Sequence, residues 1–424
     1  MHKLRKFLAI LLILVSFIAV GCSLNWPAGE IPAPTASDSF GLEQLSEDKS
    51  PAPTPSAPAA NAIPETSVPA TAPPEPSAQP MPRSFSILAA GDVMAHADNL
   101  RAAYDKETGI YSFLENYTLV KPLIEGADLA IANLETVTAG ESSGYTSFPL
   151  FNTPDAILDG LKYAGFDVIV TANNHTLDRG QDGILRTLAQ IKDRGLLSIG
   201  TYDEKEKNYL TVTVAGTEVS ILAYTQHLNG NDSLLGPDRK HMVNTMNRES
   251  IIADIRTAAS HSGLVIVYLH WGEEYTRQTE EWQSGYARVL FEAGADVILG
   301  THPHVVRPDE TFFIDGEYKY AIYSMGNFIS NFIRQDKRAN ALHTEDGVMI
   351  LMDFDIDGSG KVSLRTARPV PTWPYKYEDG TGLHYEIIPV PDPESLVHAN
   401  EYARTEAIAS YHRTMELLKG FGLQ

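Results

Sequence analysis

Six short apolar runs alternate along the chain with amphipathic stretches such as 184–194 and 282–293. The runs are rich in aliphatic and β-branched residues and have the length of buried strands, whereas the amphipathic stretches have helical spacing. Strands and helices that alternate in this way predict an α/β fold. The six runs are 85–90, 129–132, 168–171, 265–269, 297–299 and 320–323.

Two further pairs of runs predict antiparallel hairpins, so we expect mixed sheets and not purely parallel ones. Residues 210–214 and 218–224 flank a turn that contains Gly216, and residues 348–356 and 362–366 flank a turn that contains Gly358. The chain then becomes rich in Pro and Tyr, and it closes with a predicted helix from about residue 401 to 418.

Each of the six runs ends in residues that can bind a metal ion or a polar ligand. In α/β proteins, ligands bind beyond the carboxyl ends of the strands. Any one cluster alone could be a turn, a hydrogen-bonded loop or a buried core histidine, but six together favour one site. The clusters are Gly91-Asp92, Asn133-Leu134-Glu135, Asn173-Asn174-His175, His270-Trp271-Gly272, Gly300-Thr301-His302-Pro303-His304 and Ser324-Met325-Gly326-Asn327.

The residue types at these strand ends indicate a divalent metal site. Imidazoles and carboxylates suit Zn²⁺, Mn²⁺ or Fe, and thiolate ligands are excluded because the only cysteine, Cys22, lies near the N-terminus. Several histidines around a bridging carboxylate favour two ions, about 3.5–4 Å apart. Such a pair polarises a phosphoryl or carbonyl oxygen and generates hydroxide near neutral pH.

The ordered set of clusters closely resembles the CapA-type capsule synthesis proteins, which are associated with poly-γ-glutamate. The resemblance extends from about Ser86 to Pro371. This family is in turn similar to the calcineurin-like metallophosphoesterases. The resemblance implies their shared fold, an α/β structure in which a β-sandwich is flanked by helices.

The resemblance also implies roles for individual residues. Glu135 stands where a bridging carboxylate is expected, and His175 matches the acid that protonates the leaving oxygen. Asp178 lies three residues further on and is expected to orient the His175 ring, as carboxylates do for other imidazoles in metal sites. The expected metal ligands are Asp92, Glu135, Asn174, His270, His302 and His304, and the expected substrate contacts are Asn133, Trp271, Glu274 and Asn327.

One position departs from the metallophosphoesterase pattern. The usual first motif has a histidine two residues after the aspartate, where this chain has Met94, and His96 has the wrong spacing. One of the two ions is therefore expected to be weakly held or absent.

The N-terminus predicts export and a lipid anchor. A positive stretch precedes the apolar run 7–20. Gly21 and Cys22 follow this run and complete a sequence that resembles a bacterial lipobox. The alternatives are an ordinary signal peptide, or an uncleaved anchor, with an incidental cysteine. Residues 1–22 are thus expected to be a lipoprotein signal, and residues 23–83, rich in Pro, Ala and Ser, a disordered tether. A metallophosphatase-type domain is expected over 84–371, with a C-terminal extension over 372–424 packed on it.

These features predict a lipid-anchored protein on the extracytoplasmic face of the membrane that acts in capsule or poly-γ-glutamate synthesis with a hydrolase-like metal site. The net charge of −21 argues against nucleic acid as a partner. The expected partners are the membrane and an anionic polymer or its synthase complex. Two alternatives stay open: a non-enzymatic export or assembly factor with a structural metal site, and an exported phosphoesterase or nucleotidase.

Overall fold

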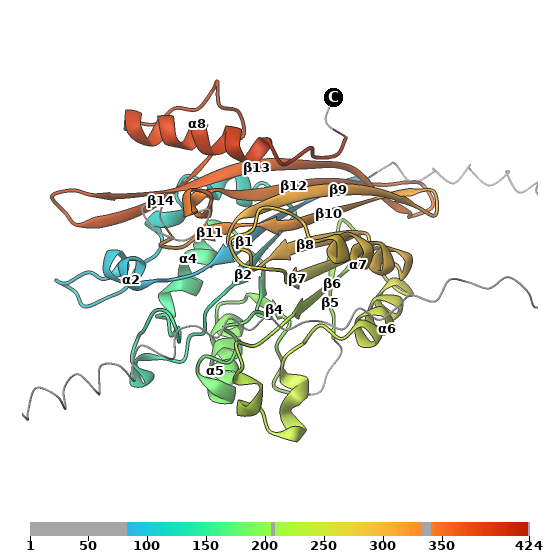
Figure 1. Ribbon diagram of the computed structural model, residues 1–424, viewed down its shortest axis with the longest axis horizontal. Helices are drawn as coiled ribbons and strands as arrows, with labels where there is room; N and C mark the ends of the chain where they lie inside the picture. The colour runs from blue at the N-terminus through green and yellow to red at the C-terminus, as the bar shows by residue number, and fades with distance from the viewer. Residues whose placement is uncertain (1–82, 205–207, 333–340, 423–424) are drawn as a thin grey trace, which may run out of the picture. The chain divides into compact units, whose positions relative to one another are not determined.

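The computed structural model describes residues 83–204, 208–332 and 341–422 (Figure 1). The expected lipoprotein signal, Cys22 and nearly all of the expected tether lie outside the described residues. The described part begins with the first strand of a two-sheet α/β structure. The expected β-sandwich flanked by helices is therefore confirmed.

The first sheet has the strand order β14-β13-β12-β1-β2-β3-β4, and β11 pairs with β1 outside this path. Strands β1 to β4 run parallel, whereas β12, β13 and β14 form an antiparallel extension. The strands are β1 (Arg83–Val93), β2 (Leu129–Leu134), β3 (Val168–Val170), β4 (Leu197–Ile199), β11 (Asn327–Ile329), β12 (Gly347–Ile356), β13 (Val362–Glu378) and β14 (Leu383–Pro389).

The second sheet has the strand order β5-β6-β7-β8-β10-β9. Its four central strands are parallel, and an antiparallel strand closes each edge. Both expected hairpins are present, as β5–β6 here and as β12–β13 in the first sheet. The strands are β5 (Leu210–Val214), β6 (Thr217–Thr225), β7 (Leu264–His270), β8 (Val297–Thr301), β9 (Val306–Ile314) and β10 (Glu317–Met325).

Alternate residues of the central strands form two different cores, because successive side chains point to opposite faces of a sheet. In β1, Ile87 and Ala89 belong to the core between the two sheets, together with Ile266 of β7. Leu88 and Ala90 belong instead to a core on the outer face of the first sheet. The parallel strands are buried on both faces, which explains why they read as continuous apolar runs.

Helices cover the outer faces of both sheets (Figure 1). Helices α3 and α4, together with Ile191 of α5, pack on the first sheet, and α6 and α7 pack on the second. The helices are α2 (Ala97–Ala103), α3 (Lys121–Ile124), α4 (Ala156–Ala164), α5 (Gly180–Asp193), α6 (Arg248–Ala259), α7 (Glu281–Glu292) and α8 (Glu401–Met415). Short 3₁₀ turns lie at Glu115–Tyr117, Glu141–Ser143, Asn231–Leu234, Pro237–Met242 and Ala341–Glu345.

The C-terminal part of the chain completes the first sheet. The expected boundary after residue 371 falls inside β13, so residues up to Pro389 belong to the sheet and not to a separate extension. The prolines near this point do not end the strand, since the Pro371 carbonyl still accepts a hydrogen bond from the Val390 amide at 2.8 Å. The expected terminal helix is present as α8, and its Ala403 and Ala407 pack against Trp373 of β13.

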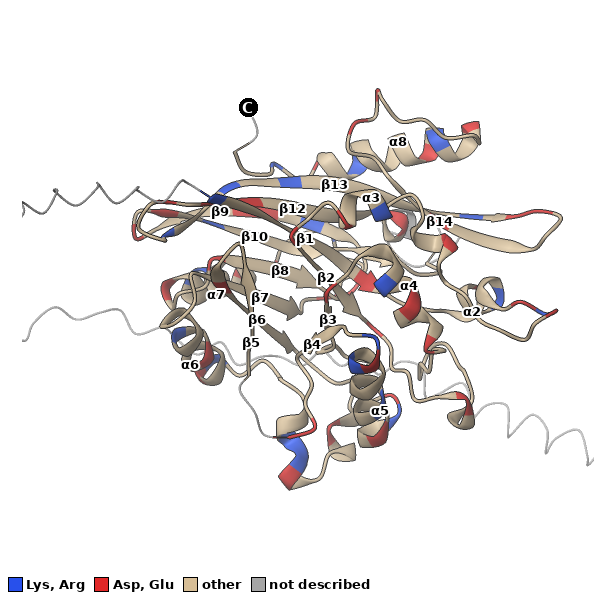
Figure 2. Cartoon of the chain, turned by 180° about the vertical axis from the view of Figure 1, so that it is seen from behind, with Lys and Arg blue, Asp and Glu red and all other residues tan. Residues whose placement is uncertain are grey.

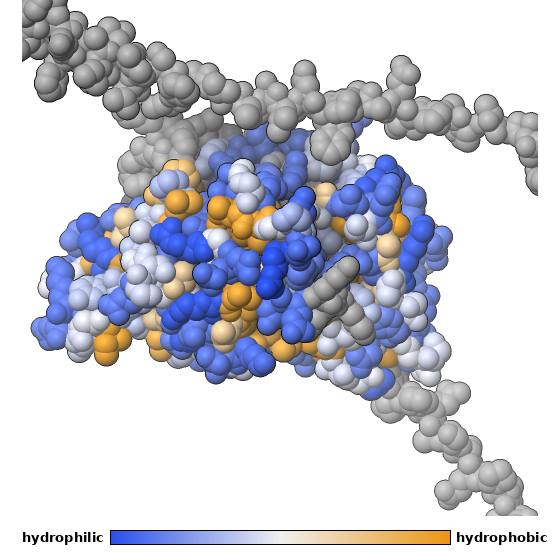
Figure 3. All heavy atoms as spheres, turned by 90° about the horizontal axis from the view of Figure 1, so that it is seen from below, coloured by the Kyte–Doolittle hydropathy of each residue, from blue (hydrophilic) through white to orange (hydrophobic). Residues whose placement is uncertain are grey.

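The surface of the described region is mixed in charge and polarity. Figure 2 shows acidic and basic residues side by side on helices such as α5 and α6. On the face drawn in Figure 3, hydrophobic groups lie in small patches between hydrophilic residues. Among residues 83–204, 208–332 and 341–422, no helix combines the length and the apolar character that crossing a membrane requires.

Candidate metal centre

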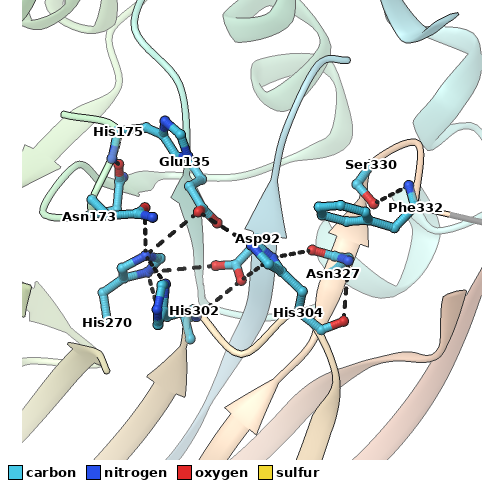
Figure 4. A network of polar contacts seen from close by, with 12 residues as sticks. Asp92, Glu135, Asn173, His175, His270, His302, His304, Asn327, Ser330 and Phe332 are labelled. Carbon is cyan, nitrogen blue, oxygen red and sulfur yellow. Dashed lines mark hydrogen bonds and ion pairs between the residues drawn. The ribbon is translucent and has the colours of Figure 1, made fainter. Parts of the chain in front are cut away.

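The carboxyl ends of strands from both sheets bring the polar clusters together at one place (Figure 4). Asp92 near the end of β1 lies opposite Asn133 of β2 and Asn327 of β11 in the strand register. His270 ends β7 in the second sheet, directly opposite Thr301, which ends β8. Residues that are far apart in the sequence therefore share one buried site between the sheets.

Two glycines allow the strands to approach closely enough to build this site. A Cβ atom on Gly91 would lie 2.0 Å from the Gly326 carbonyl oxygen. A Cβ atom on Gly300 would lie 2.1 Å from the Tyr323 carbonyl oxygen. No side chain fits at such distances, so glycine is required immediately before Asp92 and just before the loop that carries His302.

Among the described residues, a first group of possible metal ligands consists of Asp92, Glu135 and His304, whose ligand atoms all lie within 4.8 Å of one another. His304 Nδ1 lies 3.7 Å from Asp92 Oδ2. The Asp92 carboxylate is fixed from two sides, since the Asn133 amide donates to Oδ1 at 2.7 Å and the His302 backbone N–H donates to Oδ2 at 3.1 Å. We call this group the first position.

The second group consists of Glu135, His270 and His302, again within 4.8 Å of one another. His302 Nδ1 lies 3.1 Å from His270 Nε2. The Asn174 side-chain oxygen lies 3.0 Å from the same His270 nitrogen, so it can complete this set. We call this group, with Asn174, the second position.

Glu135 belongs to both groups, as expected of a bridging carboxylate. Its side chain is 0% exposed, and neither carboxylate oxygen accepts a hydrogen bond from the residues that the structure describes. Its carboxyl group lies beside that of Asp92, and His270 Nε2 and His304 Nε2 lie 3.6 and 3.9 Å from its Oε1. An unpaired buried carboxylate is costly, and cations on either side relieve that cost. The residues present therefore fit a divalent cation pair.

Burial shifts the pKa values of these side chains strongly. It raises the pKa of Asp92 to about 7 and raises the pKa of Glu135 well above its usual range, the negative charge of Asp92 adding to the latter shift. Burial, together with the neighbouring histidines, lowers the pKa values of His270 and His302 well below 6.5. Both imidazoles are thus neutral near pH 7, which is the form that binds a metal ion.

The loop after β8 has a strained backbone. His302 and His304 have φ angles of 97° and 58°, in the left-handed region that residues other than glycine seldom adopt. Tyr275 has a φ of 62°, and its backbone N–H donates to the Pro303 carbonyl of the same loop at 2.8 Å. Such strain is held by surrounding structure and is concentrated at functional sites.

A histidine–carboxylate pair lies beside the ligand groups. His175 Nδ1 is 2.8 Å from Asp178 Oδ2, and both residues are buried. The Phe151 amide also donates to this Asp178 oxygen at 2.7 Å, and the Phe151 ring packs edge-on against the imidazole. The imidazole is therefore fixed in orientation.

Sequence comparison identifies the family. Residues 86–332 match the model of the bacterial capsule synthesis protein family PGA_cap, which is more than half of the chain. The chain belongs to this family. It is 26% identical over 265 residues to the PGA biosynthesis protein CapA of Bacillus subtilis, which covers 60% of this chain and 66% of that protein. It is 28% identical over 222 residues to the capsule biosynthesis protein CapA of Bacillus anthracis, which covers 50% and 52%. The match thus spans between half and two thirds of these relatives' own lengths.

Two solved structures overlap with this PGA_cap family member more loosely. A hypothetical protein from Thermus thermophilus has a TM-score of 0.38 at 15% identity and covers 66% of this chain and 98% of its own. The NAD nucleotidase NadN of Haemophilus influenzae has a TM-score of 0.41 at 12% identity and covers 80% and 64%. These similarities are too low to bear on function.

All six metal ligands expected in this PGA_cap protein lie in the two positions, although their role as ligands stays a prediction.

One of the four expected substrate contacts, Trp271, lies in the core. Trp271 is 0% exposed and lies in the core under α7, where its indole N–H donates to the Tyr323 carbonyl. This placement does not fit a substrate contact, because the ring faces away from the site.

Two amides expected to contact substrate are instead committed to expected ligands. Asn133 donates to Asp92, and Asn327 Oδ1 lies 3.0 Å from His304 Nδ1 while its amide donates to the His304 and Thr344 carbonyls. Both are fully buried. Glu274 alone of the four is exposed, and its negative charge acts on Glu135, so it lies near the centre.

Met94 is buried in a small cluster with Phe151 and Phe332, and it brings no ligand atom to either group. His96 packs against the same two aromatic rings, and its Nδ1 accepts a hydrogen bond from the Asn331 amide at 3.3 Å. The first position therefore has three ligands from the described residues, and Met94 stands where the metallophosphoesterase pattern has a histidine.

Sequence reasoning missed two residues of the site. His227 lies just beyond the end of β6, and its Nε2 is 3.2 Å from Nε2 of His302. Arg307 is fully buried beneath the segment 272–280. His227 follows an apolar strand as the other clusters do, so the same strand-end pattern contained the signal, whereas Arg307 lies within a strand and carries no such signal.

Proposed function

We propose that this chain is a metal-dependent hydrolase that cleaves an amide bond of an anionic capsule polymer of the poly-γ-glutamate class. The observation that carries the proposal is the buried Glu135 carboxylate, which two ligand groups share and to which no amide, hydroxyl or imidazole of the described residues donates a hydrogen bond. The choice of polymer rests on the family and on the PGA biosynthesis protein of Bacillus subtilis.

The two positions define what a metal pair would do here. Asp92 and His304 would hold one ion, Asn174, His270 and His302 the other, and Glu135 both. When bound, such ions polarise the scissile bond and supply a nucleophile near neutral pH. Asn133 and Asn327 keep the Asp92 carboxylate and the His304 ring in place through their hydrogen bonds.

His175 is suited to deliver a proton to the leaving nitrogen. In the protonated ring, Nδ1–H donates to Asp178 Oδ2, which leaves Nε2–H available to the substrate. When Nε2 gives up this proton, Asp178 still holds the ring in the same orientation. This is the arrangement of a general acid supported by a carboxylate.

The proposal can be tested on the purified protein with poly-γ-glutamate of defined length. Protein loaded with Mn²⁺ or Zn²⁺ should shorten the polymer, as followed by size-exclusion chromatography, and protein stripped of metal should not. The double variant His302→Ala, His304→Ala is the control for contaminating hydrolases. A phosphomonoester and a phosphodiester, offered in parallel, would identify an exported phosphoesterase if they alone are hydrolysed.

A second candidate, a non-enzymatic assembly factor for the polymer, is favoured by one observation. Met94 leaves the first position with three protein ligands, so that its ion is expected to be weakly held, and a centre without its full metal pair would bind an ion without turning over substrate. A protein that binds metal and polymer but cleaves neither the polymer nor the phosphoesters would establish this candidate in place of the hydrolase.

We also propose that the protein is tethered to the extracytoplasmic face of the membrane through Cys22. The support is the position of the chain's only cysteine at the end of the apolar run 7–20. Cys22→Ala should leave the detergent phase in a Triton X-114 partition, or accumulate unprocessed. A variant that stays membrane-bound with an unchanged mass would contradict the anchor.

A further inference from the structure

The segment Gln226–Asn229, which follows β6, contacts three ligands of the second position. The Gln226 backbone N–H donates to the His270 carbonyl at 2.9 Å. His227 Nε2 lies 3.2 Å from His302 Nε2. The Asn174 amide donates to the Asn229 side-chain oxygen at 3.4 Å. Four consecutive residues therefore reach His270, His302 and Asn174.

His227 contacts Nε2 of His302, the ring nitrogen that points away from the other ligands of the second position. His302 Nδ1 faces His270 Nε2 at 3.1 Å, inside the second position, whereas Nε2 faces His227. If Nδ1 binds an ion, Nε2 carries the proton and needs an acceptor, and His227 Nε2 can accept it. Histidines that bind metals nearly always donate their other N–H in this way, which fixes the ring and its tautomer.

Asn229 fixes the orientation of the Asn174 side-chain amide, as His227 fixes the ring of His302. Because the Asn174 nitrogen donates to Asn229, its oxygen is the atom that faces His270 Nε2 at 3.0 Å. Only the oxygen of an amide can bind a cation, since its NH₂ group is a donor. Asn229 therefore selects the orientation that a ligand needs.

The segment is itself anchored to the end of β7. Beyond the backbone bond to His270, the Gln226 side-chain oxygen accepts from the Gly272 amide at 2.8 Å. Gln226 is thus hydrogen-bonded to the residues on both sides of Trp271, His270 and Gly272. The first position is supported from elsewhere, by Asn133 and Asn327.

We infer that the segment Gln226–Asn229 is a positioning element for the second metal position alone, with His227 orienting His302 and Asn229 orienting Asn174. The inference rests on the proposed metal centre, and it adds residues outside the ligand set. The contacts of this segment reach ligands of the second position, so that a change in it should alter the affinity for one ion and spare the other.

The experiment measures Mn²⁺ binding by isothermal titration calorimetry in single-position backgrounds. His304→Ala removes a ligand of the first position, and His302→Ala removes one of the second. Adding His227→Ala to the His304→Ala background should weaken Mn²⁺ binding about 10–100-fold, the usual effect of losing such a supporting partner. Adding His227→Ala to the His302→Ala background should leave the Mn²⁺ affinity of the first position unchanged.

Two further variants keep the result interpretable. His227→Gln restores an acceptor and should recover part of the affinity, whereas His227→Phe keeps a ring without an acceptor and should not. Asn229→Gly, which suits the positive φ of 52° at this residue, should weaken the same position. His261→Ala, at an exposed histidine on the surface, is the matched control and should bind Mn²⁺ as the parent does.

The outcomes separate this inference from the proposed function. If the parent protein binds no Mn²⁺ at all, the metal centre itself is wrong. If it binds Mn²⁺ and His227→Ala weakens both backgrounds equally, or neither, the metal centre stands and the positioning role of the segment is overturned.

Discussion

Nδ1 of His175 lies 2.8 Å from Oδ2 of Asp178, three residues further along the chain, and both side chains are buried. These contacts fix the orientation of the His175 ring, and His175 belongs to neither ligand group. Mutation of His175 can therefore test whether proton transfer depends on a residue that does not bind the metal ions.

His175→Ala should keep the fold and the bound metal but lose about 10²–10⁴-fold in turnover, the usual contribution of a general acid. A substrate with a better leaving group should recover part of the loss, because it needs less help from a proton donor. Turnover and metal content, measured on the same samples, check this. Loss of metal in proportion to activity would make His175 a ligand instead.

The metal-free protein should respond to pH through Asp92. Burial raises the pKa of this carboxyl from 3.8 to about 7, so the folded state holds the proton more tightly than the unfolded state. Its contribution to stability is present at low pH and is lost as the pH rises through about 7. Asp92→Asn removes this loss, and its advantage in melting temperature over the wild type should grow from pH 5 to about pH 7 and then level off.

The buried histidines, whose pKa values are lowered, have the opposite pH dependence and are present in both proteins. Glu135 has the same sign as Asp92, and removing the Asp92 charge lowers the pKa of Glu135, which adds to the advantage of Asp92→Asn at high pH. Melting temperatures at pH 5, 6, 7 and 8 in the presence of a chelator provide the measurement. A difference that stays constant, or that shrinks as the pH rises, would show that Asp92 does not take up a proton on folding.

Arg307 should stabilise the segment 272–280, which carries Glu274 and Tyr275 near the centre. Its guanidinium donates to the Glu273 and Thr276 carbonyls, each at 2.7 Å, and to the Glu280 and Gln283 side chains at 3.2 and 2.7 Å. Arg307→Leu leaves these acceptors unpaired and should cost on the order of 3 kcal/mol of unfolding free energy.

Chemical denaturation measures this cost, and hydrogen exchange should show faster amide exchange across 272–280. Arg307→Lys keeps the positive charge but lacks the planar set of N–H donors, so its unfolding free energy should lie between those of the wild type and Arg307→Leu. Arg256→Leu, at an exposed position on α6, is the matched control. Equal effects at the two arginines would contradict a special role for Arg307.

The sequence predicted the six strands that end in the site, because strands buried on both faces leave continuous apolar runs and their carboxyl ends carry the polar residues. It missed β4, β9, β11 and β14. The expected domain boundary after residue 371 falls inside β13, because the stretch rich in Pro and Tyr continues the strand and the Pro371 carbonyl keeps its hydrogen bond.

Within the site, proximity in the sequence was a poor guide to the direction of a side chain. Trp271 follows His270 directly, yet alternate residues of a strand face opposite ways, so the ring enters the core under α7. Asn133 and Asn327 point inward but hold expected ligands and do not face substrate. The role of Arg307 could not be foreseen from the sequence, because its acceptors lie on segments that are brought next to it only by the fold.

The most direct test of the proposed centre is the metal content per chain, measured by elemental analysis after equilibrium dialysis against an excess of Mn²⁺, which also fills a first position that holds its ion weakly. We expect two ions in the wild type, one in His302→Ala, one in His304→Ala, and none retained in Glu135→Gln, because Glu135 alone belongs to both positions. Two ions retained by Glu135→Gln would contradict a bridging carboxylate, and no ions in the wild type would contradict the metal centre as a whole.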